Sequence, residues 1–295
     1  MKRKITDILS SGKILVSDGA WGTLLQAKGL GAGECPELWN VEHPDAVLDV
    51  ARSYIEAGAD MIETNSFGGS SIKLAHYKLD KRAFELNEAA ASISRRAAGE
   101  DRYVLGSIGP TGKLLMMEEY SETDFYRSFA EQAQALAAGG ADAIAVETMS
   151  DIEEARLAIR AVRDNTKLEV ICTMTFEKTK NEDFRTMMGF SPRDMVESIL
   201  QEGVDIIGAN CGNGIRDMTD IVREIRTVNT KIPVLIHANA GIPVYRDGKT
   251  VFPETPEEMA SFIDPIILAG ANIVGGCCGT TPEHIRQIRE KISKK

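Results

Sequence analysis

The chain has 295 residues, of which 43% are hydrophobic, and its formal net charge is −10 at pH 7. An acidic chain lacks the basic face that contacts to nucleic-acid phosphates require, and no apolar run approaches the roughly 20 residues of a membrane-spanning helix, so we expect neither partner. The first 20 residues hold no apolar run longer than the one at 14–16, which is too short for a signal peptide, and we expect a cytoplasmic protein.

Eight short apolar runs, separated by helical patterns, are predicted to be β-strands. In chain order they lie at 14–18, 61–65, 104–108, 143–147, 170–174, 205–209, 234–238 and 273–276. Near-continuous apolar runs are typical of parallel strands that are buried on both faces. Eight such alternations predict an α/β protein with a (β/α)8 TIM barrel, forming a single domain over residues 1–295. A doubly wound open sheet is the alternative, but it would usually need fewer strands and a phosphate-binding fingerprint.

A similar phrase recurs where helices are predicted to lead into strands: EAGADMIE (56–63), AAGGADAIAVE (137–147), QEGVDIIGAN (201–210) and LAGANIVGG (268–276). Each reads as a helix end, a glycine cap, a polar turn and a buried strand, which indicates a repeated βα unit. GPTGKL (109–114) is not a P-loop, because Ser107 and Leu114 stand where the motif requires glycine and Ser or Thr. The stretches 29–41, 67–71, 176–191 and 241–254 are predicted to be non-helical loops around the barrel mouth.

Polar and thiol side chains follow the predicted strands at their carboxyl ends, where the active sites of such barrels lie. They are Asp18, Glu63, Asn65, Glu147, Asp151, Cys211, Asn239, Cys277 and Cys278. The sixth and eighth strands flank the seventh, so Cys211 can face the adjacent cysteines Cys277 and Cys278, which glycines would allow to bend toward one target. Three thiols and an open fourth position are typical of a catalytic zinc site.

Each candidate has a simpler explanation as well. Five cysteines without an export signal are a poor disulfide framework, and thiols gathered in a reducing compartment more often serve metal binding or catalysis. Cys211 alone can be a small buried hydrophobe, and the adjacent cysteines can pair as a vicinal disulfide. Asp18 and Glu147 can be helix caps or solvated loop acids. We expect Cys172 to fill the core, Cys35 to be a loop thiol without a role, and His237 and His284 to be structural.

Taken together, these residues resemble the homocysteine S-methyltransferase family over nearly the whole chain. The similarity is greatest to the homocysteine-binding module of cobalamin-dependent methionine synthase. The similarity to betaine–homocysteine and S-methylmethionine–homocysteine methyltransferases is smaller. The motifs are DGAWGT (18–23), AGADMIETNSFGGS (57–70), GSIGPTG (106–112), GADAIAVETMSD (140–151), GANCG (208–212), NAGIP (239–243) and GGCCGTTPEHI (275–285). The chain departs from the family at NCGNGIRD, where relatives commonly have Ser or Ala, then Leu and Gly-Pro, after Asn-Cys.

The resemblance implies roles for individual residues. The catalytic thiolates that would bind Zn²⁺ are Cys211, Cys277 and Cys278. Asn239 would supply an exchangeable fourth ligand before the substrate arrives. The ammonium and carboxylate ends of homocysteine would be held by Asp18, the backbone of Gly19 and Ala20, and Glu147.

The implied reaction is methyl transfer to the thiolate of homocysteine, because zinc deprotonates a bound thiol and the thiolate is the nucleophile. The resemblance favours a methylated corrinoid as donor, carried by a separate protein or as free methylcobalamin, since no room is left after the last predicted helix for a corrinoid-binding domain. S-methylmethionine and betaine are competing donors, although betaine calls for an aromatic cage and few aromatics lie near the mouth. The same residues would also suit an enzyme with a different thiol acceptor, a zinc- or redox-sensing protein without turnover, or, less well, a zinc hydrolase.

Overall fold

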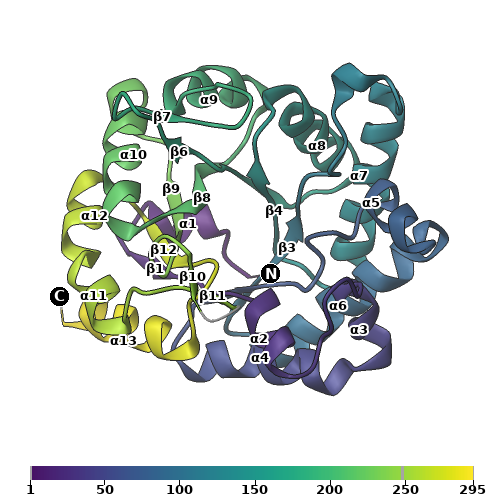
Figure 1. Cartoon of the computed structure of the whole chain (residues 1–295), viewed down its shortest axis with the longest axis horizontal. Coiled ribbons are helices and arrows are strands. Elements are labelled where there is room, and N and C mark those ends of the chain that lie inside the picture. The colour runs from purple at the N-terminus through teal and green to yellow at the C-terminus, as the bar shows by residue number, and fades with distance from the viewer. Residues whose placement is uncertain (1, 247–248, 295) are drawn as a thin grey trace.

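The predicted apolar runs form a nearly closed ring of eight parallel strands in the computed structural model, which describes residues 2–246 and 249–294. The strands are β1 (Leu15–Val16), β2 (Met61–Glu63), β3 (Tyr103–Ile108), β4 (Ala143–Met149), β5 (Glu169–Met174), β8 (Ile206–Gly214), β9 (Val234–Asn239) and β12 (Ile273–Gly276). Their order is β1-β12-β9-β8-β5-β4-β3-β2 (Figure 1). The TIM-barrel prediction is confirmed and the open-sheet alternative is wrong; residues 1, 247–248 and 295 of the predicted domain lie outside the described residues.

Helices surround the ring (Figure 1). The longer ones are α4 (Pro44–Glu56), α6 (Ala83–Ala98), α7 (Glu122–Ala138), α8 (Ile152–Asn165), α9 (Pro192–Ile199), α10 (Ile215–Val228), α12 (Ile263–Ala269) and α13 (Pro282–Ser293). Ser121 and Ser191 cap α7 and α9, and in both helices the aspartate three residues later completes a capping box. No helix in the described ranges is long and apolar enough to cross a membrane.

Shorter elements lie in the connections. They are α1 (Ile5–Leu9), α2 (Gly22–Ala27), α3 (Trp39–Glu42), α5 (Ser71–Leu74), α11 (Pro256–Ser261), and the 3-10 turns η1 (Pro36–Leu38), η2 (Ala75–Tyr77), η3 (Asp80–Arg82), η4 (Leu115–Met117) and η5 (Leu200–Glu202). Two hairpins, β6 (Glu177–Lys178) with β7 (Phe184–Arg185) and β10 (Val244–Arg246) with β11 (Lys249–Val251), occupy two of the predicted loops. The prediction that 29–41 is non-helical is wrong in its second half, because Pro36 starts a turn and Trp39 anchors it in the core.

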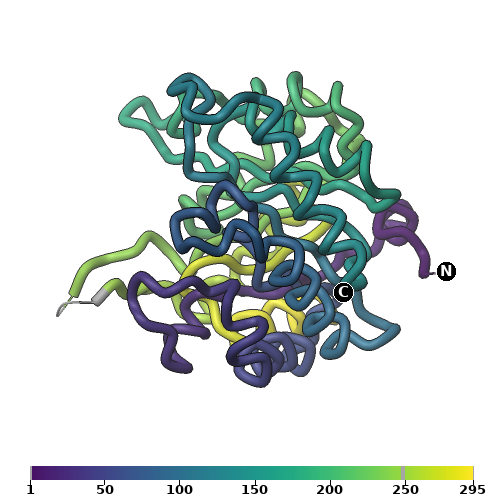
Figure 2. Tube along the Cα trace, turned by 90° about the vertical axis from the view of Figure 1, so that its right-hand side faces the viewer, coloured from purple at the N-terminus to yellow at the C-terminus, as the bar shows by residue number. Residues whose placement is uncertain are grey.

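The amino-terminal end of the barrel is closed by α1. Ile5 and Leu9 pack into the inner cluster formed by inward-facing strand residues. Glu169 at the start of β5 holds this helix, since its carboxylate accepts hydrogen bonds from the backbone N–H of Ile5 (2.6 Å) and Thr6 (3.0 Å). Figure 2 shows the N-terminal segment at one end of the molecule and β10 and β11 at the other. The carboxyl-terminal end is therefore the open one.

The recurring sequence phrase has a structural cause. At each joint an Asp or Asn exchanges hydrogen bonds with the backbone of the preceding barrel strand; Asp60, for example, donates its N–H to Val16 O (2.7 Å) and accepts from Val16 N (2.9 Å). The other three joints are pinned alike by Asp142, Asp205 and Asn272. Because Asp60 links β1 to the start of β2, it closes the ring between the two ends of the strand order.

An arginine from a helix braces each of these joints. Each one donates both to the joint's glycine carbonyl and to the Asp or Asn; the four are Arg95 of α6, Arg163 of α8, Arg226 of α10 and Arg289 of α13. The last of them reaches from the final helix back to the joint before β2, with Arg289 Nε 2.7 Å from Gly58 O. The repeat is thus cyclic, and Arg289 fastens the end of the chain to its beginning.

We expect Arg289→Gln to lower the free energy of unfolding by about 1–3 kcal/mol, because it removes charge-assisted hydrogen bonds to Gly58 and Asp60 in a partly buried site. Urea-induced unfolding measures the change. Arg286→Gln is the matched control on the same helix: its partner is the exposed Glu283, and its loss should have a much smaller effect, because exposed ion pairs contribute little to stability. Equal effects of the two substitutions would contradict a bracing role.

Candidate active site

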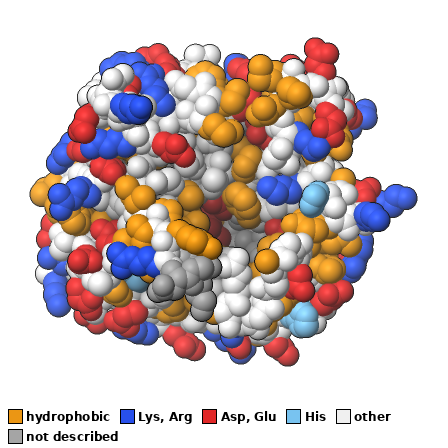
Figure 3. All heavy atoms as spheres, viewed as in Figure 1, with side chains coloured by type: hydrophobic (Ala, Val, Ile, Leu, Met, Phe, Trp, Pro, Cys, Tyr) orange, Lys and Arg blue, Asp and Glu red, His pale blue; other side chains and the backbone are white. Residues whose placement is uncertain are grey.

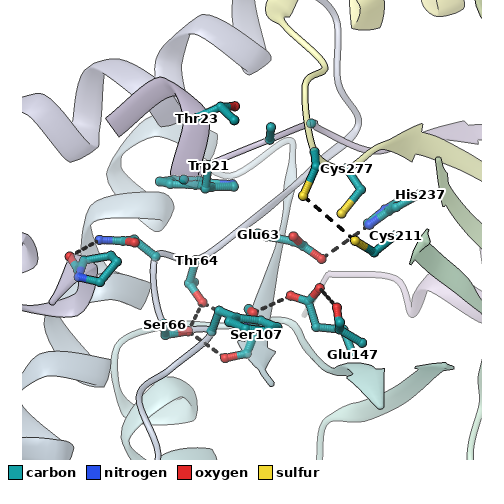
Figure 4. A pocket seen from close by; sticks show the side chains of 18 of the residues that line it. Trp21, Thr23, Glu63, Thr64, Ser66, Ser107, Glu147, Cys211, His237 and Cys277 are labelled. Carbon is teal, nitrogen blue, oxygen red and sulfur yellow. Dashed lines mark hydrogen bonds and ion pairs between the residues drawn. The ribbon is translucent and has the colours of Figure 1, made fainter. Parts of the chain in front are cut away.

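A cavity of about 360 Å³ lies at the carboxyl-terminal ends of the strands. Side chains from five different strands or strand ends face it: Glu63, Glu147, Cys211, His237, Cys277 and Cys278 (Figure 4). Figure 3 shows the face of the molecule that is seen in Figure 1, with a central hollow and hydrophobic side chains beside it. Since α1 closes the other end of the barrel, ligands must enter the barrel from this side.

Three cysteines form a compact sulfur cluster. The Sγ atoms of Cys211, Cys277 and Cys278 all lie within 4.8 Å of one another, and Cys211 Sγ is 3.9 Å from Cys278 Sγ. Cys211 comes from the end of β8, and the adjacent cysteines directly follow β12; β9 lies between these two strands. All three thiols are free and partly exposed. The three thiols therefore converge at the open end of the barrel, as predicted.

The backbone at Cys211 has an unusual conformation. Its φ is +60°, in the left-handed region that non-glycine residues rarely adopt, and Gly212 follows with φ +71°. The register of β8 against β9 shifts between Asn210 and Gly214, so the strand bulges where the thiol emerges. A Cβ at Gly212 would lie 2.4 Å from Phe176 O, and the glycine is therefore required both for its φ and for this close approach.

The glycines next to Cys277 and Cys278 act differently from the prediction. Gly275 and Gly276 belong to regular β12, where an added Cβ would lie 2.8 Å from Asp18 O at the first position and 2.3 Å from Thr280 Oγ1 at the second. They permit close packing, whereas Gly279, with φ +80°, makes the turn. Backbone hydrogen bonds tie the cysteines to β9, with Cys277 N donating to Ala238 O (2.7 Å) and Cys278 O accepting from Ala240 N (3.0 Å).

The cluster favours a single negative charge in the absence of metal. Hydrogen bonds from the Cys277 and Cys278 thiols lower the pKa of Cys211 to about 3. The same hydrogen bonding with Cys211 raises the pKa of Cys278 to about 11 and that of Cys277 well above its usual value. Three soft sulfur donors that share one charge are suited to a thiophilic cation such as Zn²⁺.

Asn239 lies at the end of β9 and is 3% exposed. Its side chain hydrogen bonds to Cys211, which further lowers the pKa of that thiol. Its Oδ1 is buried and has no hydrogen-bond partner among the described residues. A buried amide oxygen without a described partner, on a side chain that contacts Cys211, is suited to be the fourth donor for a tetrahedral metal.

Asp18 and Glu147 are both buried, but only Glu147 faces the cavity. Asp18 accepts hydrogen bonds from Trp21 Nε1 (2.8 Å) and Glu63 N (2.8 Å), and burial raises its pKa to about 6. Glu147 accepts from Ser107 Oγ and from Asn210 Nδ2 (2.9 Å), and burial raises its pKa to about 7. The solvated-loop explanation is wrong for both residues.

Glu63 and His237 also face the cavity, and neither was assigned a binding role from the sequence. Glu63 Oε1 lies 3.5 Å from His237 Nδ1, and their side chains are 12% and 4% exposed. Glu63 Oε1 and His237 Nε2 are buried without hydrogen-bond partners in the described part of the chain. Burial lowers the pKa of His237 to about 4, so the imidazole is neutral at pH 7. The position of Glu63 at a strand end was visible in the sequence, but its unpaired oxygen was not.

Gly19 and Ala20 line the cavity beside Trp21. The N–H of Ala20 donates to Thr280 Oγ1 at 3.1 Å, and a Cβ at Gly19 would lie 2.5 Å from the same oxygen. This contact joins the loop after β1 to the turn that follows the adjacent cysteines. The backbone of both residues is thus held close to the sulfur cluster.

Three further predictions concern Cys172, His284 and Cys35. Cys172 is fully buried in the core of β5, and His284 caps α13 with Thr281 while its Nε2 contacts Glu254 O (3.1 Å), as expected for structural residues. Cys35 is a free thiol in the loop before η1, as predicted; it is 5% exposed and its Sγ lies 3.2 Å from Glu37 Oε2. Burial raises its pKa to about 12.

A TIM barrel with three clustered thiols and buried carboxyls at its mouth is the arrangement of an enzyme. The chain belongs to the homocysteine S-methyltransferase family, which it matches over residues 15–292. The resemblance derived from the sequence motifs is confirmed.

Two relatives are methionine synthases from mycobacteria. The chain is 35% identical to the one from Mycobacterium tuberculosis over 307 aligned positions and 33% identical to the one from Mycobacterium leprae over 309. Both alignments cover 98% of this chain and 25% of the relative. The chain therefore spans about a quarter of the length of these relatives.

Solved structures agree on the fold. The metallated form of the homocysteine methyltransferase MmuM from Escherichia coli superposes with a TM-score of 0.79 at 23% identity, covering 97% of this chain and 98% of that one. Its oxidized form gives the same TM-score and identity over 98% and 100%. The carboxyl transferase domain of Rhizobium etli pyruvate carboxylase, at 14% identity and a TM-score of 0.54, shares only the barrel, covering 98% of this chain and 51% of that one.

Proposed function

We propose that this chain is a cytoplasmic, zinc-dependent S-methyltransferase that moves a methyl group from a corrinoid to the thiolate of homocysteine, giving methionine. One observation carries the proposal: the three-sulfur cluster shares a cavity with buried carboxyls in a chain of this family. Free thiols this close together are typical of a reducing compartment, which supports a cytoplasmic location.

Cys211, Cys277 and Cys278 would hold Zn²⁺, with the Asn239 amide oxygen as a fourth donor that homocysteine displaces. The sulfur spacing and the unpaired Asn239 oxygen fit this role. Bound zinc would deprotonate the substrate thiol and keep it available as a nucleophile at neutral pH. A metallated form of MmuM, a homocysteine methyltransferase with the same fold, supports a metal in this barrel.

The carboxyls and the loop after β1 would receive the amino-acid part of homocysteine. Glu147 faces the cavity, and Asp18 is buried against the cavity residues Trp21 and Glu63; buried acids favour a cation such as the substrate's ammonium group. The backbone of Gly19 and Ala20 lines the same cavity and would lie at the carboxylate end. The protein thus presents anionic groups to one end of the substrate and sulfur ligands to the other.

The side chains around the open end of the barrel favour a bulky methyl donor. Eight of the ten large hydrophobic side chains that are exposed in the described residues lie on connections that follow barrel strands: Phe67, Leu114, Met116, Met117, Met187, Ile242, Tyr245 and Val251. Exposed hydrophobic side chains gathered around a cavity are typical of an interaction surface, which fits a corrinoid and the separate protein that would carry it. Betaine fits less well, because Trp21 and Phe67 are the aromatic side chains that line the described cavity.

The donor experiment offers zinc-loaded protein and homocysteine each of four donors in turn: methylcobalamin, a methylated corrinoid protein, S-methylmethionine and betaine. We expect methionine from the corrinoid donors, and faster turnover with the protein-borne one, because only it can use the interaction surface around the cavity. Methionine from S-methylmethionine or betaine alone would overturn the donor assignment and leave the acceptor assignment intact. Zinc uptake without methionine from any donor would favour a zinc- or redox-sensing protein.

A further inference from the structure

Glu63 is the carboxyl in the cavity that lacks partners. It lies at the end of β2, and Figure 4 shows its carboxyl group between the sulfur cluster and Glu147. Its Oε1 is buried and accepts no hydrogen bond from any described residue; the nearest imidazole nitrogen, His237 Nδ1, lies 3.5 Å away. A buried carboxylate oxygen without a donor is costly and marks a place where a ligand is expected.

The two neighbouring carboxyls are already engaged by protein donors. Asp18 Oδ2 accepts from both Trp21 Nε1 and Glu63 N, and its Oδ1 accepts from Ser17 Oγ (3.2 Å). Glu147 accepts from Ser107 on Oε1 and from Asn210 on Oε2. These two carboxyls contribute negative potential, whereas Glu63 has an oxygen free to accept a new donor.

The surroundings of Glu63 select a cation as that donor. Burial, and then the charges of Glu147 and Asp18, raise the pKa of Glu63 well above its usual range. A neutral donor would satisfy its oxygen but leave the acidic cluster uncompensated. An ammonium group would do both, since it donates N–H bonds and offsets the charge.

We propose that Glu63 determines substrate specificity by accepting a hydrogen bond from the α-ammonium group of the thiol substrate. The inference rests on the proposed function and narrows its substrate class to α-amino thiols. Thiol acids without an ammonium group would be excluded. A site that leaves a buried acceptor unpaired rejects an analogue without the matching donor far more strongly than an apolar pocket rejects a missing methylene.

The test compares homocysteine with 4-sulfanylbutanoate, which is the same molecule without the ammonium group. Equilibrium binding to zinc-loaded protein and kcat/KM are measured for both thiols with the wild type and with Glu63→Gln. We expect the substitution to weaken homocysteine binding and lower its kcat/KM by roughly 10–100-fold and to change both quantities for the analogue by less than about threefold, so that discrimination collapses. Glu63→Asp keeps the charge but shortens the side chain and should give an intermediate loss.

Glu154→Gln is the matched control, because it makes the same change at a buried glutamate that binds Thr111 outside the cavity. It should leave discrimination unchanged, and all variants should retain their zinc. The inference would be overturned if Glu63→Gln still preferred homocysteine to the analogue as strongly as the wild type does. It would also be overturned if binding and kcat/KM fell equally for both thiols. If the wild type binds homocysteine in preference to the analogue but methylates neither, and Glu63→Gln erases that preference, the inference holds while the proposed function fails.

Discussion

Replacing Cys211 with serine is expected to remove the metal and abolish methyl transfer. The purified wild type should contain about one zinc per chain, and Cys211→Ser close to none. Changing only the outer partners of metal ligands typically costs 10–100-fold in metal affinity or activity, so losing one of three thiolate ligands should cost more than about 100-fold. Metal analysis of the reduced protein and the rate of methionine formation measure the two effects.

Cys172→Ala is the control for this substitution. Cys172 is a fully buried thiol in β5, away from the cavity lining, and its replacement should leave a small void that costs stability but no zinc. A Cys211→Ser protein that keeps a full zinc complement would contradict the proposed ligand set. Loss of zinc from a correctly folded Cys172→Ala protein would also contradict it.

Gly212→Ala is expected to reduce zinc affinity without touching any sulfur atom. An alanine Cβ would lie 2.4 Å from Phe176 O, and this carbonyl is held in place because it accepts a hydrogen bond from Asn213 Nδ2 (2.6 Å). The backbone next to Cys211 must therefore move, and the Cys211 thiol with it. We expect affinity for zinc, measured by competition with a chromogenic chelator, to fall by roughly 10–100-fold.

The matched control is Gly189→Ala. Gly189 also has a positive φ, +92°, but an added Cβ would meet nothing within 4 Å. Both substitutions carry the backbone cost of about 1–2 kcal/mol for a side chain in the left-handed region, and only Gly212→Ala carries the clash. Equal zinc affinities in the two variants would show that the position of Cys211 does not depend on Gly212.

The sequence by itself determined the barrel and the sulfur cluster. Apolar runs and glycine caps are local signals, so the eight strands were placed within a few residues; the run at 234–238, for example, became Val234–Asn239. The strand order of a (β/α)8 barrel follows from the chain order, which allowed Cys211 to be placed opposite Cys277 and Cys278. Strand ends were less certain, since β8 continues through a bulge to Gly214.

Only the tertiary structure decided which polar atoms remain free at the mouth. Asp18, Glu63 and Glu147 all follow strands in the sequence, yet the oxygens of Asp18 and Glu147 are engaged by Trp21 and Asn210, whereas Glu63 Oε1 has no hydrogen-bond partner among the described residues. Trp21 is only three residues from Asp18, but the Asn210 donor comes from another strand, 63 residues from Glu147 in the chain. A hydrogen bond depends on position to within a few tenths of an ångström, and no local sequence pattern contains that information.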